Sequence, residues 1–156
     1  MIFAAGKRIE DCYEQILDLW FGTPGDVHID SWIELDAVDG WRVGLSEKPS
    51  ARGPKLFFVN LGAYRAGEFT EAHATGFYVA ADAMEAKKRA LAGLLKTGFT
   101  ERHKDDLLDI DDCLAIAGAN GLHVTLTRTN AVSDLTPNNG YHAIPKPVIA
   151  AWLARR

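Results

Sequence analysis

The sequence predicts an α+β fold in which two tandem units with mostly antiparallel sheets are related by a pseudo-two-fold axis and followed by a C-terminal helix. Self-similarity is the first observation, because a short apolar run leads into a helical pattern at residues 3–5 and again at 79–81. Each half then ends on Asp-Gly or Asn-Gly before residues of alternating polarity, which predicts a tight hairpin. The predicted divisions are a first repeat at 1–45, a linker at 46–54, a second repeat at 55–128 and a tail at 129–156, although 156 residues also suit one compact domain.

The first repeat is predicted to open with a strand at residues 2–5 and to continue into a helix that FGTPG, at 21–25, terminates. The segment HIDSWIELD from His28 and the hairpin at Asp39 complete this repeat. The apolar face of its helix consists of Ile9, Cys12, Tyr13, Ile16 and Trp20. Because no hairpin precedes the strand at 2–5, its backbone needs a partner from the second repeat, from GYHAIP in the tail, or from another copy of the chain.

The second repeat has the complete β-β-α-β-β order. A strand at 55–62 and a turn at 63–67 lead to a strand at 77–81, and a helix then begins at a capping box of Asp82 and Glu85. The helix face consists of Ala83, Ala86, Ala90, Leu91, Leu94 and Leu95, and Gly98 ends it. Alternation of Leu108, Asp109, Ile110 and Asp111 predicts a half-buried strand before the hairpin at Asn120. In the tail, a loop precedes a short helix that packs through Val148, Ile149, Trp152 and Leu153.

Several of these segments resemble a known family. KLFFVNLGAY…GEFTEAHATGFYVA, HKDDLLDIDDCLAI and NGLHVTL resemble a bacterial family of domains of unknown function that occurs as one or two copies per chain. The segments LWFG, HIDSW and VDGWRV are similar to the amino-terminal copy of that family. The resemblance spans most of residues 1–128 and implies a fold but no established activity. The first repeat departs from the pattern because it has no LF-x-V-x-LGG-like opening before Phe3.

Composition excludes several classes of protein. A net charge of −4 provides no basic surface for a phosphate backbone, so nucleic acid is not an expected partner. No apolar run reaches the roughly 18 to 20 residues of a membrane span, and the first residues lack the pattern of a signal peptide. The two cysteines, Cys12 and Cys113, are far apart, which argues against a disulfide framework or a zinc knuckle. We therefore expect a cytoplasmic protein.

Three pairs of a histidine and a carboxylate are spaced two residues apart, so the side chains of each pair share one face of a strand. The pairs are His28 with Asp30, Glu71 with His73, and His103 with Asp105. Such a pair can bind a divalent ion or form a general base, but it can also simply fix the end of a strand. Because the first repeat has no equivalent of Glu71 and His73, we expect these two residues to be structural.

Other polar or aromatic features are explained at least as well by structure. DLLDIDDC at 106–113 lacks the ligand spacing of a calcium-binding loop. Cys113 is a candidate nucleophile with His103 or His123, yet a single cysteine is more often a small buried apolar residue. The tryptophans either line a ligand cleft or anchor the core, and core anchoring is favoured; they are Trp20, Trp32, Trp41 and Trp152.

Two functions from different classes are compatible with these features. The first is a non-enzymatic binding or assembly module of the bacterial cytoplasm, in which an incomplete sheet edge or a groove recruits a protein partner. The alternative is a small metal-assisted or His/carboxylate hydrolase that uses Glu71, His73, His103 and Asp105. The sequence assigns no catalytic residue, metal or cofactor. We expect a homodimer formed at or near the open edge of the first repeat.

Overall fold

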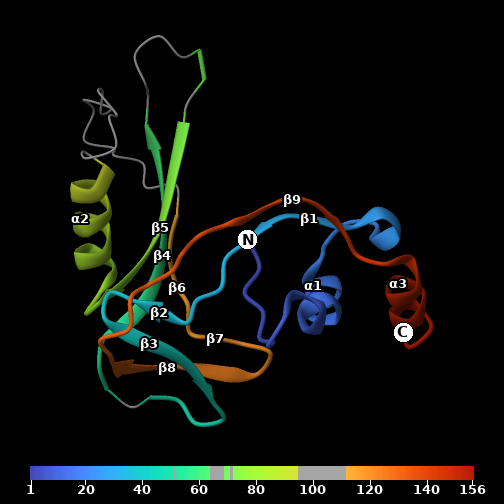
Figure 1. The fold of residues 1–156 in the computed structure, drawn as a ribbon, viewed down its shortest axis with the longest axis horizontal. Coiled ribbons are helices and arrows are strands. Elements are labelled where there is room, and N and C mark those ends of the chain that lie inside the picture. The colour runs from blue at the N-terminus through green and yellow to red at the C-terminus, as the bar shows by residue number, and fades with distance from the viewer. Residues whose placement is uncertain (51, 64–68, 71, 95–111) are drawn as a thin grey trace. The chain divides into compact units, whose positions relative to one another are not determined.

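The computed structural model describes residues 1–50, 52–63, 69–70, 72–94 and 112–156. They form helices and antiparallel sheets, so the predicted α+β class is confirmed (Figure 1). The chain forms two compact units that are interleaved along the sequence. Unit 1 contains residues 1–35, 118–122 and 134–156, and unit 2 contains residues 36–117 and 123–133.

Unit 1 is held together by two helices and a two-stranded ribbon. The 3-10 turn η1 (Ile9–Cys12) continues into α1 (Tyr13–Leu19), which packs against α3 (Lys146–Leu153). Strand β1 (His28–Trp32) follows η2 (Pro24–Asp26) and pairs antiparallel with β9 (Asn138–Ala143). The buried core consists of Leu17, Val27, Ile144, Ile149 and Trp152. The end of the chain therefore completes the core that its beginning starts.

Two predicted core residues of unit 1 are exposed. The helix α1 ends at Leu19, and Trp20 takes extended backbone angles, so its side chain leaves the helical stripe, stacks on Phe21 and is 39% exposed. Leu153, at the end of α3, is 50% exposed, whereas Ile149 and Trp152 are buried as predicted. The helical period places a residue on a face only within the helix, and both exposed residues lie at or beyond a helix end.

The predicted strand at residues 2–5 is wrong, because residues 1–6 have no regular secondary structure. The side-chain amide of Gln15 binds Ala5 instead: its oxygen accepts the Ala5 N–H at 2.9 Å, and its nitrogen donates to the Ala5 carbonyl at 2.7 Å. A helix side chain thus takes the place of the partner strand expected for this peptide. The GYHAIP stretch contributes to β9 and pairs with β1 rather than with residues 2–5.

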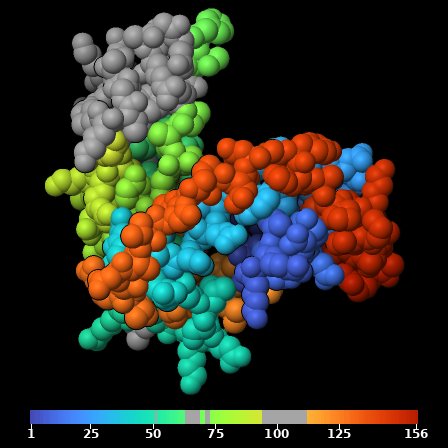
Figure 2. Space-filling model, in the orientation of Figure 1, coloured from blue at the N-terminus to red at the C-terminus, as the bar shows by residue number. Residues whose placement is uncertain are grey.

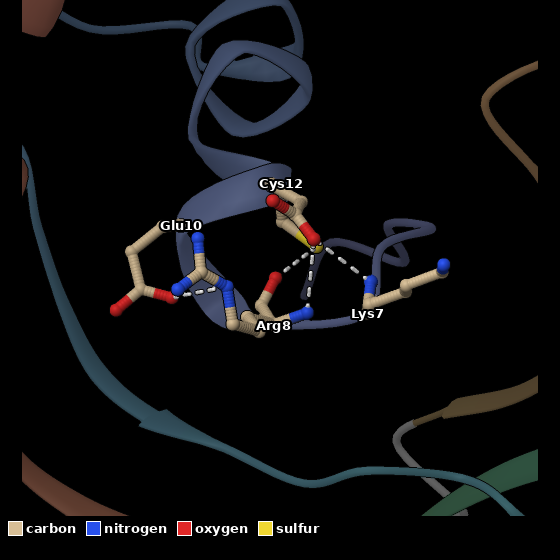
Figure 3. A network of polar contacts seen from close by, with 5 residues as sticks. Lys7, Arg8, Glu10 and Cys12 are labelled. Carbon is tan, nitrogen blue, oxygen red and sulfur yellow. Dashed lines mark hydrogen bonds and ion pairs between the residues drawn. The ribbon is translucent and has the colours of Figure 1, made fainter.

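A polar network starts the first helical turn directly after this segment (Figure 3). The backbone N–H groups of Lys7 and Arg8 both donate to one carboxylate oxygen of Asp11 at 3.1 Å. The Cys12 thiol donates to the Arg8 carbonyl at 3.7 Å, and Arg8 pairs with Glu10 at 3.9 Å. These contacts satisfy backbone groups that a helix start leaves open, so we interpret the network as a cap.

Unit 2 is built around β4 (Lys55–Ala63), which lies between β5 (Ala72–Ala80) and β6 (Asp112–Ala115) in an antiparallel sheet. Leu56, Phe57, Phe58 and Val59 are all buried, as expected for the central strand of a sheet covered on both faces. Strand β5 begins earlier than the predicted 77–81, because the full length of β4 gives it a partner.

The helix α2 (Ala83–Leu94) covers one face of this sheet and contacts all three strands. The predicted cap by Asp82 is confirmed, because its carboxylate accepts the Glu85 N–H at 2.9 Å. The Glu85 carboxylate reaches one residue further back than a capping box requires and accepts the Ala81 N–H at 2.8 Å. Ala86 and Ala90 are buried against the sheet, so small side chains allow a close approach of helix and strands. The predicted helix end at Gly98 and the predicted strand around residues 108–111 lie outside the described residues.

Both predicted hairpin turns are present. Asp39 and Gly40 have φ values of 54° and 74°, and Asn120 and Gly121 have φ values of 50° and 74°, as a type I′ turn requires. The turns connect β2 (Ala37–Val38) to β3 (Trp41–Ser46), and β7 (Gly118–Ala119) to β8 (Leu122–Arg128). These strands form a sheet in the order β2-β3-β8-β7.

The pairing of β3 with β8 has a symmetric register. Gly44 lies opposite Thr125, and the neighbouring pairs are Val43 with Leu126 and Leu45 with Val124. Counted from the two turns, Val43 of the first hairpin corresponds to Val124 of the second, and Leu45 corresponds to Leu126. The register of the pairing is therefore symmetric about the Gly44–Thr125 pair. A β-carbon at Gly44 would lie 3.0 Å from the Thr125 hydroxyl, which makes glycine the suitable residue at this crossing.

Candidate functional site

Strand β5 lies at the edge of its sheet, and its peptide groups alternate between β4 and the open side. Val79 shows which residues face outward, because its N–H donates to the Asp39 carboxylate and its carbonyl accepts from the Arg89 guanidinium, both at 2.8 Å. Since the direction repeats every second residue along a strand, the N–H and carbonyl groups of Phe77 and Thr75 face the same open side.

The outer edge is closed at one end by an ion pair. Arg89 of α2 lies 2.8 Å from the Asp39 carboxylate, and the two side chains are 37% and 27% exposed. Together they supply the acceptor and the donor that a neighbouring strand would offer to Val79. The Arg89 guanidinium also lies over the Tyr78 ring, 5.6 Å from its centroid. This pair is not apparent from the sequence, because the turn already accounts for Asp39 and Arg89 lies outside the apolar face of its helix.

Further along β5, the outward-facing peptide groups of this edge have no partner among the described residues. Within the part of the chain that the structure describes, no group hydrogen-bonds the outward N–H or carbonyl of Thr75 or of Phe77. Thr75 is exposed and Phe77 is half-buried. Figure 2 shows the yellow-green atoms of β5 and α2 beside each other at the surface of unit 2. An exposed edge with open peptide groups is a template for pairing with another strand.

A hollow of about 250 Å³ adjoins this edge between β5, β4 and α2. Its lining includes Leu61, Ala74, Gly76, Tyr78, Ala90 and Gly93. A β-carbon at Gly76 would lie 2.8 Å from the Tyr78 hydroxyl oxygen, so the glycine allows the ring to lie over the strand. No described residue hydrogen-bonds the Tyr78 hydroxyl. Burial, with a smaller effect of Asp39, raises the pKa of Tyr78, so the hydroxyl is protonated at neutral pH.

Of the predicted polar residues in unit 2, only His73 is described. Glu71, His103 and Asp105 lie outside the described residues. His73 is an exposed residue of β5, and its Nδ1 lies 3.5 Å from the side-chain nitrogen of Asn60 on β4. The structural role expected for the Glu71 and His73 pair stays a prediction.

The pair His28 and Asp30 is formed, as the two-residue spacing predicts. His28 Nε2 lies 3.2 Å from the Asp30 carboxylate, and Nδ1 lies 3.4 Å from the Asp26 carbonyl oxygen. The ring stacks on Tyr141 with centroids 4.3 Å apart. In the neutral imidazole only one ring nitrogen carries a hydrogen, so one of these two contacts at a time is a hydrogen bond. The stack on Tyr141 joins β1 to β9 in unit 1.

Among the described residues no metal-ligand cluster is formed, and the pKa of each cysteine is raised. No group of three or more His, Cys, Asp or Glu residues among the described residues is placed to hold a metal ion. Burial raises the pKa of Cys12, and the Asp11 charge adds to the effect. Burial also raises the pKa of Cys113, against a smaller opposing effect of Lys87. Both residues are thus thiols rather than nucleophilic thiolates at neutral pH.

The tryptophans differ in their surroundings. Trp152 is buried, and its indole N–H donates to Asp18 at 2.8 Å, which makes it a core anchor. Trp32 meets the edge of the His142 ring, and Trp41 lies under the Arg128 guanidinium at 4.1 Å.

Within the described residues, no helix is long and apolar enough to cross a membrane.

Comparison with known proteins supports the same fold. The model of a family described as Domain of Unknown Function (DUF1543) matches residues 1–45. The crystal structure of a protein Il1583 from Idiomarina loihiensis is 29% identical, with a TM-score of 0.67, and the match covers 92% of this chain and 83% of that chain. None of the curated proteins matches. The amino-terminal 45 residues are therefore similar to a domain of unknown function, and the chain as a whole is similar in fold to Il1583.

Proposed function

We propose that this chain is a non-enzymatic assembly module of the bacterial cytoplasm that forms a homodimer by pairing the β5 edges of two copies. The open peptide groups of Thr75 and Phe77 carry the proposal, because they lie directly beside Val79, whose own outward groups are already bonded. Strand addition at such an edge gives affinity through main-chain hydrogen bonds. Because residues 2–5 form no strand, we place the dimer contact at β5 and not at the beginning of the first repeat.

Tandem duplication of one unit is part of the proposal. The symmetric register about Gly44 and Thr125 supports it, because two copies of one hairpin related by a two-fold axis pair in this way. The ribbon in unit 1 also supports it. In a duplicated chain β1 of the first repeat corresponds to β6 of the second repeat, and β9 pairs antiparallel with β1 as β4 pairs antiparallel with β6. In this view the tail supplies a strand that the first repeat lacks.

The alternative function is a small metal-assisted or His/carboxylate hydrolase that uses Glu71, His73, His103 and Asp105, of which only His73 is described. Assembly is proposed first because the β5 edge offers four peptide groups that no described residue bonds.

Proline at the edge tests the proposal. In Thr75→Pro the missing N–H is the outward one, so the ladder with β4 stays intact, whereas Thr75→Val keeps the N–H and serves as the matched control. Light scattering at micromolar concentration is expected to give twice the 17.1 kDa chain mass for wild type and Thr75→Val, and 17.1 kDa for Thr75→Pro.

Circular dichroism reports whether each variant folds. A folded Thr75→Pro protein that stays dimeric, or a wild-type protein that is monomeric at this concentration, would overturn the proposal. If Thr75→Pro does not fold, Thr75→Lys places like charges near each other across the paired edges and is expected to weaken the dimer in low salt. A Thr75→Lys dimer as tight as wild type would also count against edge pairing.

A further inference from the structure

We propose that Asn139 and Gly140 of β9 form a site of self-catalysed amide loss, in which the His142 imidazole acts as the general base. The reaction converts Asn139 into aspartate or isoaspartate, consumes water and releases ammonia. It accounts for two features of unit 1 that the proposed function does not use. One is an exposed Asn-Gly pair at an irregular point of a strand, and the other is a buried imidazole nitrogen without a partner among the described residues.

The sequence contains a second Asn-Gly pair, Asn120 with Gly121, and its surroundings are different. These two residues form a type I′ turn with φ values of 50° and 74°. The hairpin is closed beside the turn, because the Val124 N–H donates to the Ala117 carbonyl at 2.9 Å. Asn120 therefore reaches another backbone conformation only when the turn opens.

Asn139 and Gly140 lie where the ladder between β9 and β1 is interrupted. Ile29 faces His142, but the next pair along the ribbon is Ser31 with Asn139. One residue of β1 thus lies opposite two residues of β9, with Gly140 among them, which is the pattern of a β-bulge. Both Asn139 and Gly140 are exposed, and no described residue hydrogen-bonds the Asn139 side chain. The Asn139 side chain can therefore turn toward the Gly140 nitrogen without opening a hairpin.

The His142 ring lies over Gly140. A β-carbon at Gly140 would be 3.3 Å from Nε2 and 3.8 Å from Cε1, so this edge of the ring faces the glycine backbone. The contact with Trp32, whose ring centroid lies 4.5 Å away, holds the imidazole in this position. Nε2 is buried and has no hydrogen-bond partner among the described residues. In the tautomer with its hydrogen on Nδ1, Nε2 offers a free lone pair beside the Gly140 peptide, as a general base must.

The chemical step is a ring closure within the chain. Nε2 of His142 takes the proton of the Gly140 N–H, and the glycine nitrogen forms a bond to the side-chain carbonyl carbon of Asn139. The bond from this carbon to the side-chain nitrogen then breaks, and that nitrogen takes the proton from the imidazolium and leaves as ammonia. Water opens the resulting succinimide at either carbonyl, which gives aspartate or, with one more carbon in the backbone, isoaspartate. Glycine favours the closure because it has no side chain to block the approach of the reacting groups.

Peptide mass mapping of aged protein tests the site. Native protein is held in neutral buffer and digested with trypsin, and fragmentation spectra locate the amide loss at each asparagine; a parallel sample is aged in urea. We expect Asn139 to lose its amide faster than Asn120 in the native protein, and the two to react at similar rates in urea, where only the sequence acts. Equal rates in the native protein, or a faster reaction at Asn120, would overturn the proposal.

Replacement of His142 tests the base. His142→Gln is expected to slow amide loss at Asn139 roughly a hundred-fold in the native protein, the lower end for a positioned general base, and to leave the rate in urea unchanged. Structural damage would loosen the ribbon and speed the reaction, so slower loss is the signature of a missing base. If circular dichroism shows that His142→Gln does not fold, His142→Phe keeps an aromatic ring against Trp32 without the nitrogen and has the same expected rate.

His28→Gln is the matched control for the His142 variants. His28 belongs to the same ribbon and also stacks on an aromatic ring, that of Tyr141, so its replacement should leave the rate at Asn139 equal to that of wild type. An unchanged rate in a folded His142 variant, or equal slowing in His28→Gln, would contradict the role of His142 as the base.

Discussion

Asp39 occupies the first position of a tight turn, with a φ of 54°, and its carboxylate binds the backbone of β5 and the side chain of Arg89. Asparagine or aspartate is favoured at this φ because a short polar side chain tolerates left-handed backbone. Asparagine would satisfy the turn equally well, as Asn120 does in the second hairpin. The charge of Asp39 is therefore explained by Arg89 and not by the turn.

The first prediction concerns Arg89. Arg89→Ala removes the donor to the Val79 carbonyl and the partner of Asp39, so we expect the free energy of unfolding to fall by about 1–3 kcal/mol. Urea denaturation followed by circular dichroism measures the change. Arg52→Ala, at an exposed position of the linker, is the control and should change stability by less than about 0.5 kcal/mol. Equal effects of the two substitutions would show that the ion pair does not stabilise the edge.

Gln15 illustrates how a side chain can take the place of a strand. Its amide has a donor and an acceptor with the spacing of a peptide group, and both bind Ala5. A carboxylate at this position would accept from the Ala5 N–H but would repel its carbonyl oxygen. One long polar side chain on α1 thus tethers the start of the chain without a sheet.

Among the elements, the two hairpins are set by local backbone geometry. Their turns both have positive φ at two successive residues, which only a few residue types adopt at low cost. Strand β5, in contrast, has its ends and its exposure set by its neighbours: β4 pairs with all of it on one side, and Asp39 and Arg89 close one end of the other side. Whether such a strand serves as an interface depends on what closes its edge.

The second prediction concerns the turn before β8. Gly121 has a φ of 74°, and a β-carbon added there would meet no other atom, so Gly121→Ala is expected to lose about 1–2 kcal/mol through backbone strain alone. Gly25→Ala is the matched control, because Gly25 also has open space but no positive φ, and it should be neutral within about 0.5 kcal/mol. Thermal or urea unfolding of both variants measures the difference, and a neutral Gly121→Ala would contradict the type I′ turn.

At the scale of the whole molecule, the two units depend differently on the tail of the chain. Unit 1 takes Ile144, Ile149 and Trp152 from the tail for its core. The core of unit 2 between its sheet and α2 comes from residues 57–90. Removal of a tail anchor should therefore affect unit 1 first.

The third prediction tests this dependence with neighbouring residues of α3. Trp152→Ala removes a side chain that is 7% exposed and bonded to Asp18, and we expect unit 1 to lose about 3–5 kcal/mol. Leu153→Ala is the control, because Leu153 is 50% exposed, and it should cost less than about 1 kcal/mol. Amide hydrogen exchange should show faster exchange in α1 and β1 of the Trp152 variant, with β4 and α2 unchanged. Equal acceleration in both units would contradict independent cores.

The sequence alone determined the features that depend on residues a few positions apart. The helix cap by Asp82, the turns at Asp39 and Asn120, and the shared face of His28 and Asp30 are all correct, because each is a contact within about four residues. The α+β class follows from the same local signals combined over the chain.

Tertiary structure alone decided which segments pair. β9 joins β1, residues 2–5 join no strand, and Asp39 bonds Val79 from 40 positions away. Backbone donors and acceptors are chemically the same at every residue other than proline, so no residue type announces its partner strand. The position of β5 at the edge of its sheet is decided in the same way. It pairs with β4 on one side, and only the assembled sheet shows that no described strand pairs with its other side.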